Sequence, residues 1–333
     1  MLAAELCNGG VPRMTSFCRF ALRISPEETT FARRHFFGLD PIARERLEQI
    51  GRTFLGGYHA ALAQDEPEDL SQVLNTTDSE FRGFAFEGAA MGLSLLDRLM
   101  PWRKQRLQPF LEGPGLPHVY LLHVGIGWAL ARLPWTRRGI ERSLGGLHPL
   151  LRWLAVDGFG FHQGYFYWRR YVEQQAVPDR LSACALRVFD QGLGRSLWFV
   201  DGADIDRIAR TIGAFAAPRR PDLWRGVGLA CAYAGGVDRV GVEAFRRVAQ
   251  TYIPQLAQGA AFAAKARERA ANPAECTDVA CEVLCGVSAR EAAAVTDAAL
   301  ADLPTDGPEP AYEVWQRRIQ ARFAEERVGE LKS

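Results

Sequence analysis

The chain has 333 residues, 48% of them hydrophobic, which is enough to bury a sizeable core. Its 40 basic and 39 acidic residues leave a formal net charge of +1, so no electrostatic argument favours nucleic acid or an anionic membrane surface as a partner. No stretch approaches the roughly 18 apolar residues of a membrane span, and no signal peptide is visible. The 7 cysteines are odd in number and typical of reduced thiols, so we expect a cytoplasmic protein.

Taken in chain order, residues 1–20 are expected to form a flexible extension, residues 21–325 a single helical-repeat domain and residues 326–333 a C-terminal tail. Helix start signals are frequent. They occur at Ser25-Pro26, at Asp40-Pro41 and at the capping box formed by Ser288 and Glu291. Alternating β-branched runs are scarce, so few strands are expected. These signals predict a mostly α fold.

A short glycine pattern recurs through most of the chain. Each copy has a glycine followed two positions later by a small residue and then by apolar sequence. The spacing of about 34 residues is the length of a two-helix repeat of the tetratricopeptide type. A glycine within a helix lets a neighbouring helix approach closely. The leading glycines are Gly88, Gly125, Gly158, Gly192, Gly226 and Gly259, with Gly57 as a candidate first copy that lacks the small residue.

This repeat predicts an α/α superhelix built from helical hairpins, but the repeat is imperfect. Two clean helices cannot be placed between Gly158 and Gly192, because Pro178 breaks that stretch late. An α/α toroid or an irregular bundle is therefore the alternative fold. The Gly-x-Gly pairs do not indicate a dinucleotide-binding loop, since that loop needs a preceding strand and a third glycine.

The residues that precede the leading glycines are mostly polar within apolar sequence. In a stacked array these side chains would form one row, which would line a concave pocket. The alternative is that each residue bridges adjacent repeats through hydrogen bonds, which is the more common outcome. The row consists of Glu87, Val124, Asp157, Gln191, Arg225 and Gln258.

His123 and His162 lie close to glycines of the repeat. Histidine acting as an acid or base needs a carboxylate partner, which Glu87 or Asp157 could supply only through tertiary contact. These four residues are the candidate catalytic groups, with His162 the first choice for acid–base chemistry. The alternative is that the histidines are core residues with satisfied hydrogen bonds. No metal-ligand motif is present, and the cofactor is unknown.

The segment Phe159–Tyr171 is dense in aromatic residues, which suit a long, flat, apolar ligand. A packed aromatic core is the alternative interpretation. The candidate ligand-binding residues are Trp128, Phe161, Tyr165, Gln191, Arg195, Trp198, Arg225 and Tyr233.

The same segments carry a family resemblance that covers about residues 20–325. The blocks are Arg82–Met91, His118–Leu130, Asp157–Gln163, Asp190–Phe199, Gly226–Gly236 and Pro310–Trp315. Together they resemble the UnbL-type family, which is encoded beside enediyne polyketide synthases in actinomycetes. The resemblance implies a role in making the enediyne core from a linear polyene. It also implies the polyene or a later core intermediate as ligand, and the synthase or its neighbouring cassette proteins as partners. No catalytic residue can be carried over from the family.

Two functions fit these observations. The first is an enzyme that acts on the polyene or a later intermediate by oxidation or desaturation, halogen chemistry or cyclisation. The second is a non-catalytic protein that binds the polyene or serves as a scaffold for the synthase, as helical-repeat proteins commonly do. The lack of a recognisable redox-cofactor motif favours the second, and the pathway context favours the first.

Overall fold

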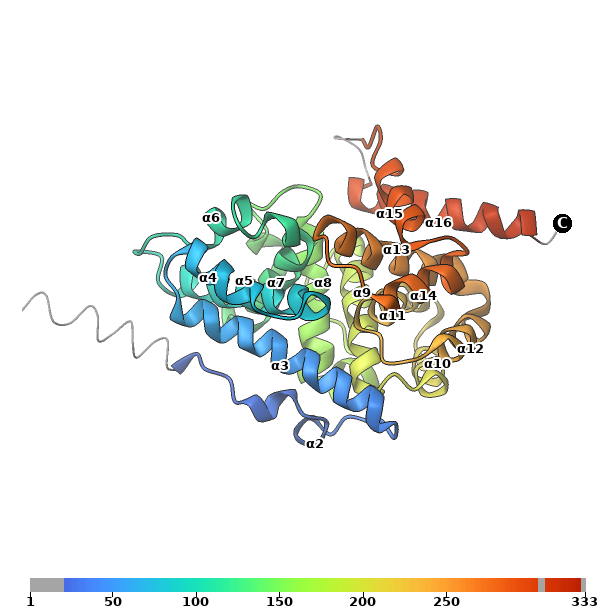
Figure 1. Ribbon diagram of the computed structural model, residues 1–333, viewed down its shortest axis with the longest axis horizontal. Helices are drawn as coiled ribbons and strands as arrows, with labels where there is room; N and C mark the ends of the chain where they lie inside the picture. Colours follow the sequence, from blue (N-terminus) through green and yellow to red (C-terminus); the bar gives the residue numbers. More distant parts are fainter. Residues whose placement is uncertain (1–20, 305–308, 331–333) are drawn as a thin grey trace, which may run out of the picture.

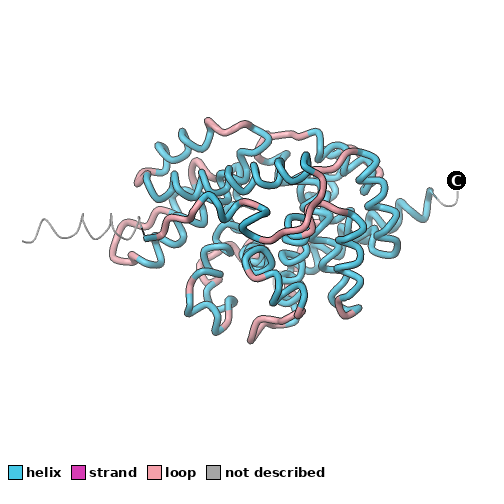
Figure 2. The backbone as a smooth tube through the Cα atoms, turned by 90° about the horizontal axis from the view of Figure 1, so that it is seen from below, coloured by secondary structure: helices cyan, strands magenta, loops and turns pink. Residues whose placement is uncertain are grey.

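The computed structural model describes residues 21–304 and 309–330, and 76% of these residues are helical. Figure 2 shows helices joined by loops, and the described residues contain no strand. The mostly α fold predicted from the helix start signals is therefore confirmed. The proposed extension at residues 1–20 lies outside the described residues.

The centre of the molecule is a row of long helices that pack side by side in chain order (Figure 1). Each contains one of the leading glycines, as the repeat predicts. The helices of this inner row are α3 (Pro41–Ala63), α5 (Ser79–Leu99), α7 (Val119–Arg132), α8 (Arg152–Phe166), α9 (Ala183–Val200), α11 (Arg220–Ala234) and α13 (Ile253–Arg269).

Shorter elements connect the inner helices and complete the repeats. They are α4 (Pro67–Asn75), α6 (Leu107–Glu112), the 3-10 turns Pro134–Arg138 and Ile140–Ser143, the π-helical turn Arg169–Glu173, α10 (Ile205–Ala214), α12 (Arg239–Ala249) and α14 (Glu275–Cys285). The irregularity expected between Gly158 and Gly192 is real, because only the π-helical turn stands there in place of a second helix. The repeat is therefore regular in its inner helices and variable in its outer elements.

The glycines of the inner row lie directly against the backbone of a neighbouring helix, and for the four described here it is the preceding helix of the row. A Cβ atom added to Gly192 would lie 1.9 Å from the carbonyl oxygen of Asp157, and one added to Gly158 would lie 2.0 Å from that of Val124. The same relation holds for Gly125 with Glu87, and for Gly226 with Gln191. Since only a hydrogen atom fits at these positions, the glycines set the spacing between helices.

The row curls until its two ends meet. Arg46 on α3 donates from Nε to the carbonyl oxygen of Ala234 on α11 at 2.6 Å. The rings of Phe84 on α5 and Tyr233 on α11 lie 5.1 Å apart between centroids. Side chains from the inner helices therefore share one enclosed interior, on the concave side of the superhelix.

Two further segments cover this interior. The N-terminal segment, with a 3-10 turn at Pro26–Thr29 and the short helix α2 (Phe31–Arg34), lies along α3 in Figure 1. At the other end, α15 (Ala289–Ala298) and α16 (Ala311–Glu330) follow the last repeat. Helix α16 runs to Glu330, so the helical region extends past the tail boundary expected at residue 325.

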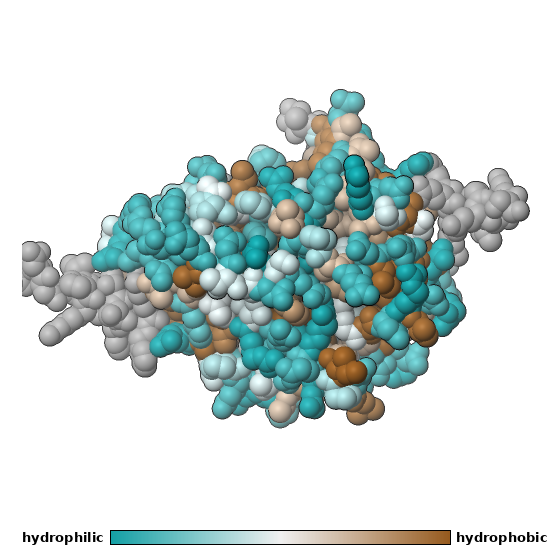
Figure 3. Space-filling view, viewed as in Figure 1, coloured by the Kyte–Doolittle hydropathy of each residue, from teal (hydrophilic) through white to brown (hydrophobic). Residues whose placement is uncertain are grey.

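The surface view in Figure 3 shows a face covered mainly by hydrophilic residues, with hydrophobic residues in small separate groups. In the ranges that the structure describes, no helix combines the length and apolar character needed to cross a membrane. Cys184, Cys231 and Cys281 are buried thiols that form no disulfide, as the odd number of cysteines led us to expect.

Candidate functional site

The polar row is assembled in the interior, with its centre at Asp157. The Asp157 carboxylate, 1% exposed, forms an ion pair with Arg195 and accepts a hydrogen bond from Gln191 Nε2 at 2.7 Å. Arg195 is one turn beyond Gln191 on α9, so both side chains reach the same face of α8. The Arg195 guanidinium also lies over the Phe161 ring, 4.7 Å from its centroid. Burial of this pair is tolerable because both charges are hydrogen-bonded.

Helix α16 satisfies the far end of the row. Gln316 donates to Gln191 Oε1 at 2.8 Å and accepts from Arg225 Nη1 at 2.8 Å. Arg225 is also paired with Asp222, one turn earlier on α11. This part of the row matches the bridging interpretation, in which polar residues connect neighbouring elements. A helix far away in sequence supplies the partners.

Glu87 is the exception in the row. Its side chain is 1% exposed, and neither carboxylate oxygen has a hydrogen-bond partner. Burial raises the pKa of Glu87 to about 7; the charge of Arg195 opposes this shift and the charge of Asp157 adds to it. The Trp128 indole N–H lies beside the carboxylate and lowers this pKa slightly, although the two groups fall short of a well-formed hydrogen bond. A buried carboxylate without a partner is costly, so this position calls for an explanation.

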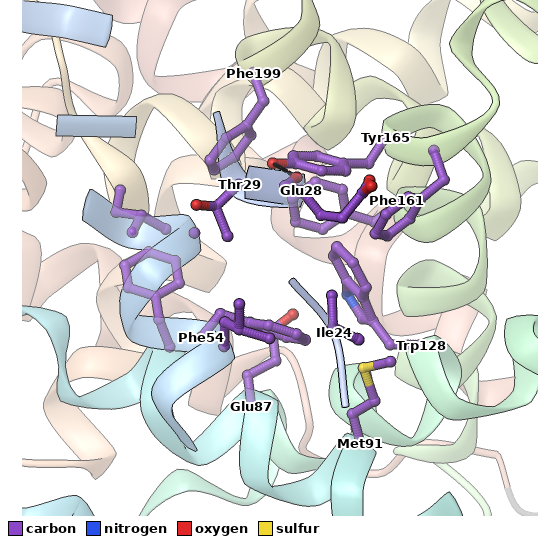
Figure 4. A pocket seen from close by; sticks show the side chains of 15 residues that line it. Ile24, Glu28, Thr29, Phe54, Glu87, Met91, Trp128, Phe161, Tyr165 and Phe199 are labelled. Atoms are coloured by element: carbon purple, nitrogen blue, oxygen red, sulfur yellow. Dashed lines mark hydrogen bonds between the residues drawn. The ribbon is translucent and has the colours of Figure 1, made fainter. Parts of the chain in front are cut away.

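Glu87 lines a small cavity that is partly open to solvent. We call it the aromatic cavity, because its walls are mainly aromatic (Figure 4). Glu28 and Thr29 contribute from the N-terminal segment, and Glu28 is held there by ion pairs with Arg33 and Arg34. The aromatic residues of the wall are Phe54, Phe84, Trp128, Phe161, Tyr165, Phe166 and Phe199.

A second small cavity follows along the same inner surface. Its polar lining comes from Asp157, Arg195, Tyr233 and Lys265. Both cavities use the same position of the repeat, three residues after each leading glycine. Met91, Trp128 and Phe161 occupy it in the aromatic cavity, and Arg195, Leu229 and Phe262 occupy it in the second cavity. The two cavities are therefore consecutive along the superhelix, with Phe161 and Arg195 in contact at their border.

The sequence matches the family described as "Protein of unknown function (DUF1702)" over residues 14–323. The chain belongs to the DUF1702 family. No curated protein and no solved structure matches it.

The structure divides the predicted site residues of this DUF1702 protein into three groups. Glu87, Trp128, Phe161 and Tyr165 line the aromatic cavity. Asp157, Arg195 and Tyr233 line the second cavity. Gln191 and Arg225 lie in the buried network under α16 and line neither cavity.

His162 does not lie where its predicted acid–base role requires. It lines neither cavity, and its ring packs on Trp128 and Phe166 with centroid distances of 5.5 and 4.7 Å. Burial lowers the pKa of His162 to about 3, and the charges of Arg132 and Arg34 act in the same direction. The imidazole is therefore neutral and a poor proton acceptor at neutral pH.

His123 and Trp198 are also held by the core of the DUF1702 fold. His123 Nδ1 is 2.8 Å from the carbonyl oxygen of Val119, and its ring faces a separate surface cavity with His148. Trp198 is fully buried, and its indole N–H donates to the Gly235 carbonyl oxygen at 2.8 Å. The geometry thus gives both residues the structural role that was the alternative to a functional one.

Several wall residues were missed from the sequence, among them Phe54, Phe84 and Phe199. A signal for part of the wall was present. The position three residues after each leading glycine is large in most repeats, and this position faces the interior. Phe84 lies two turns before that position and Phe199 one turn after it, so the repeat does not single them out. Among the described residues of this DUF1702 chain, no cluster of His, Cys, Asp and Glu is arranged to hold a metal ion.

Replacing Glu87 with glutamine is expected to increase stability above pH 7. The carboxyl has an ordinary pKa of 4.5 when unfolded and one of about 7 when folded, a difference of 7 − 4.5 = 2.5. Between these values only the folded state keeps the proton, so the free energy of unfolding falls as pH rises through this window. The loss amounts to about 3 kcal/mol, and glutamine avoids it.

Chemical denaturation of both proteins at pH 4.5 and pH 8 measures this effect. The difference in free energy of unfolding between variant and wild type should be larger at pH 8 than at pH 4.5 by about 3 kcal/mol. Glu243→Gln, at an exposed position on α12, serves as the control and should show no such pH dependence. A pH-independent difference for Glu87→Gln would show that Glu87 is already charged when buried.

Proposed function

We propose that this DUF1702 protein is a cytoplasmic enediyne biosynthesis protein that binds the linear polyene of the pathway, or a later core intermediate, in the aromatic cavity. The observation that carries the proposal is the cavity itself, whose walls are almost entirely aromatic and aliphatic. A conjugated polyene is long, thin and apolar, and flat aromatic side chains present complementary surfaces to it. The resemblance of the sequence to UnbL-type proteins supports the pathway.

The arrangement of the two cavities supports a ligand of some length. Because they follow one another along the inner surface, an elongated molecule seated in the aromatic cavity has its far end directed at the Arg195–Asp157 pair. A polar end group would find hydrogen-bonding partners there. A purely apolar end group would form no hydrogen bond there, so nothing would compensate for removing water from the charged pair.

Blocking the aromatic cavity is expected to abolish binding. Ile24 lines the cavity from the partly buried N-terminal segment, so Ile24→Trp places an indole in the cavity with little disturbance of the core. Affinity for a linear polyene, measured by equilibrium dialysis with absorbance detection, should fall at least about tenfold. A tenfold fall corresponds to about 1.4 kcal/mol of binding free energy.

Val240→Trp is the matched control, because Val240 is 65% exposed on α12 and lies outside both cavities. It should bind the polyene as the wild type does. Equal affinity for Ile24→Trp and wild type would place the ligand elsewhere and overturn the proposal.

A second measurement separates an enzyme from a carrier or scaffold. Purified protein is incubated with the polyene released by the synthase, and the mixture is examined by mass spectrometry and absorbance. A new product supports an enzyme, whereas polyene recovered unchanged from the complex supports a binding protein.

A further inference from the structure

A hydrogen-bond acceptor and a donor lie beside each other at the aromatic cavity without forming a well-formed hydrogen bond. The acceptor is the Glu87 carboxylate on α5, and the donor is the Trp128 indole N–H on the adjacent helix α7. Glu87 is 1% exposed and Trp128 is 6% exposed. Figure 4 shows both side chains at the cavity, together with Met91, which also comes from α5. Such groups left without partners in an apolar setting are candidates for contact with a ligand.

We propose that Glu87 is a proton-transfer residue for an unsaturated carbonyl compound bound in the aromatic cavity, with Trp128 donating a hydrogen bond to the carbonyl oxygen. This proposal rests on the proposed function and narrows its ligand to one that carries a carbonyl group conjugated, or able to become conjugated, with the chain. A purely hydrocarbon ligand would leave both polar groups unpaired. A carbonyl next to an acidic CH₂ group uses both.

The reaction is a redox-neutral shift of a double bond. The Glu87 carboxylate takes a proton from the carbon beside the carbonyl, so a C–H bond breaks and an O–H bond forms. The electron pair passes into the carbonyl and the adjacent double bond as a dienolate, whose oxygen accepts from Trp128. Glu87 then returns the proton to a carbon further along the chain. No oxidant, reductant or metal is consumed, and the atoms balance.

The surroundings of Glu87 suit this chemistry. Arg195 on α9 and Asp157 on α8 are the charged groups that influence it most, and they are paired with each other. Tyr233 on α11 is also within electrostatic reach. From the N-terminal segment Glu28 faces the cavity, but it is paired with Arg34. α3 contributes apolar side chains such as Phe54.

With this set of neighbours the pKa of Glu87, raised to about 7 by burial, lets the residue both accept and release a proton near neutral pH. Since the carboxylate is the base, the rate should rise with pH and reach half its maximum near pH 7.

Solvent exchange tests the proposal with a defined probe. The probe is a linear ketone in which one CH₂ group separates the carbonyl from a single carbon–carbon double bond. The wild type in deuterated water should incorporate deuterium into the probe and convert it to the conjugated enone, which absorbs at longer wavelength. Glu87→Gln should bind the probe but exchange it at least about 100-fold more slowly. Trp128→Phe keeps the ring and removes the N–H, and should slow exchange by about tenfold or more.

Glu243→Gln, exposed on α12, is the control and should match the wild type. Exchange by Glu87→Gln at the wild-type rate, or a wild-type rate that does not change between pH 5.5 and pH 8, would overturn the proposal. The proposed function has its own readout in the binding step. Bound probe without exchange removes only the role of Glu87, whereas a wild type that does not bind the probe or the polyene removes both.

Discussion

Alanine at Gly192 is expected to destabilise the protein by about 4 kcal/mol or more, a loss that single substitutions rarely cause. The added methyl carbon would lie 1.9 Å from the carbonyl oxygen of Asp157 and 2.8 Å from the backbone nitrogen of Phe161. Both atoms belong to the backbone of α8, so no side-chain rotation can make room. The two helices would have to separate, and the ion pair between Asp157 and Arg195 would separate with them.

Gly213→Ala provides the matched control. Gly213 lies within α10, is exposed, and has nothing within 4 Å of the added carbon. Because alanine is a better helix former than glycine, this variant should be more stable by up to about 1 kcal/mol. The stabilities of the two variants are compared by urea denaturation followed by circular dichroism. If Gly192→Ala is insoluble while Gly213→Ala is soluble, Gly192→Ala is destabilised even more strongly. Similar stabilities for both variants would show that the inner helices are not in backbone contact.

The second large effect is expected from Arg195→Met. Methionine preserves much of the packing on Phe161 but leaves the Asp157 carboxylate buried with only the Gln191 amide as a partner. Removing one member of a buried ion pair costs about 3–5 kcal/mol. The pKa of Glu87 should rise as well, because in the wild type the charge of Arg195 lowers this pKa.

Two further variants show whether charge causes this loss. Asp157→Asn combined with Arg195→Met removes both charges and keeps an acceptor for Gln191, so it should recover most of the stability. Arg239→Met breaks a pair with Glu282 in which both side chains are about half exposed, and should cost at most about 1 kcal/mol. A double variant no more stable than Arg195→Met alone would mean that packing of the Arg195 side chain, rather than its charge, stabilises the fold.

The inner row of helices could be predicted from the sequence because close contact between neighbouring helices requires glycine at one position of each repeat. Each leading glycine must lie in a helix, against the backbone of a neighbour, and the period of about 34 residues follows from this. The outer elements have no comparable pattern in the sequence. They range from helices such as α10, with 10 residues, to the single π-helical turn at Arg169–Glu173, and they carry no repeated pattern.

The polar row was predictable as a row but not in its chemistry. Its members occupy the same position in successive repeats, which the sequence shows. Their hydrogen-bond and ion-pair partners come from elsewhere in the chain. Gln316 on α16 satisfies Gln191 and Arg225, across more than 90 residues of sequence. Glu87 has no such partner, and only the folded structure reveals that. His162 illustrates the reverse case, since its place beside aromatic residues suggested a ligand site, whereas its ring packs on Trp128 and Phe166 and lines neither cavity.

The backbone contacts of the inner helices have a consequence for how a ligand is selected. The inner helices already touch at Gly125, Gly158 and Gly192, so these helices cannot move closer together around a small molecule. The width of the aromatic cavity is therefore fixed before binding, and the binding energy is not spent on ordering the walls. Selection among ligands then depends on side chains such as Met91 and Phe161 at one repeated position. Within this family, a change of ligand would follow from substitutions there, with the helical framework unchanged.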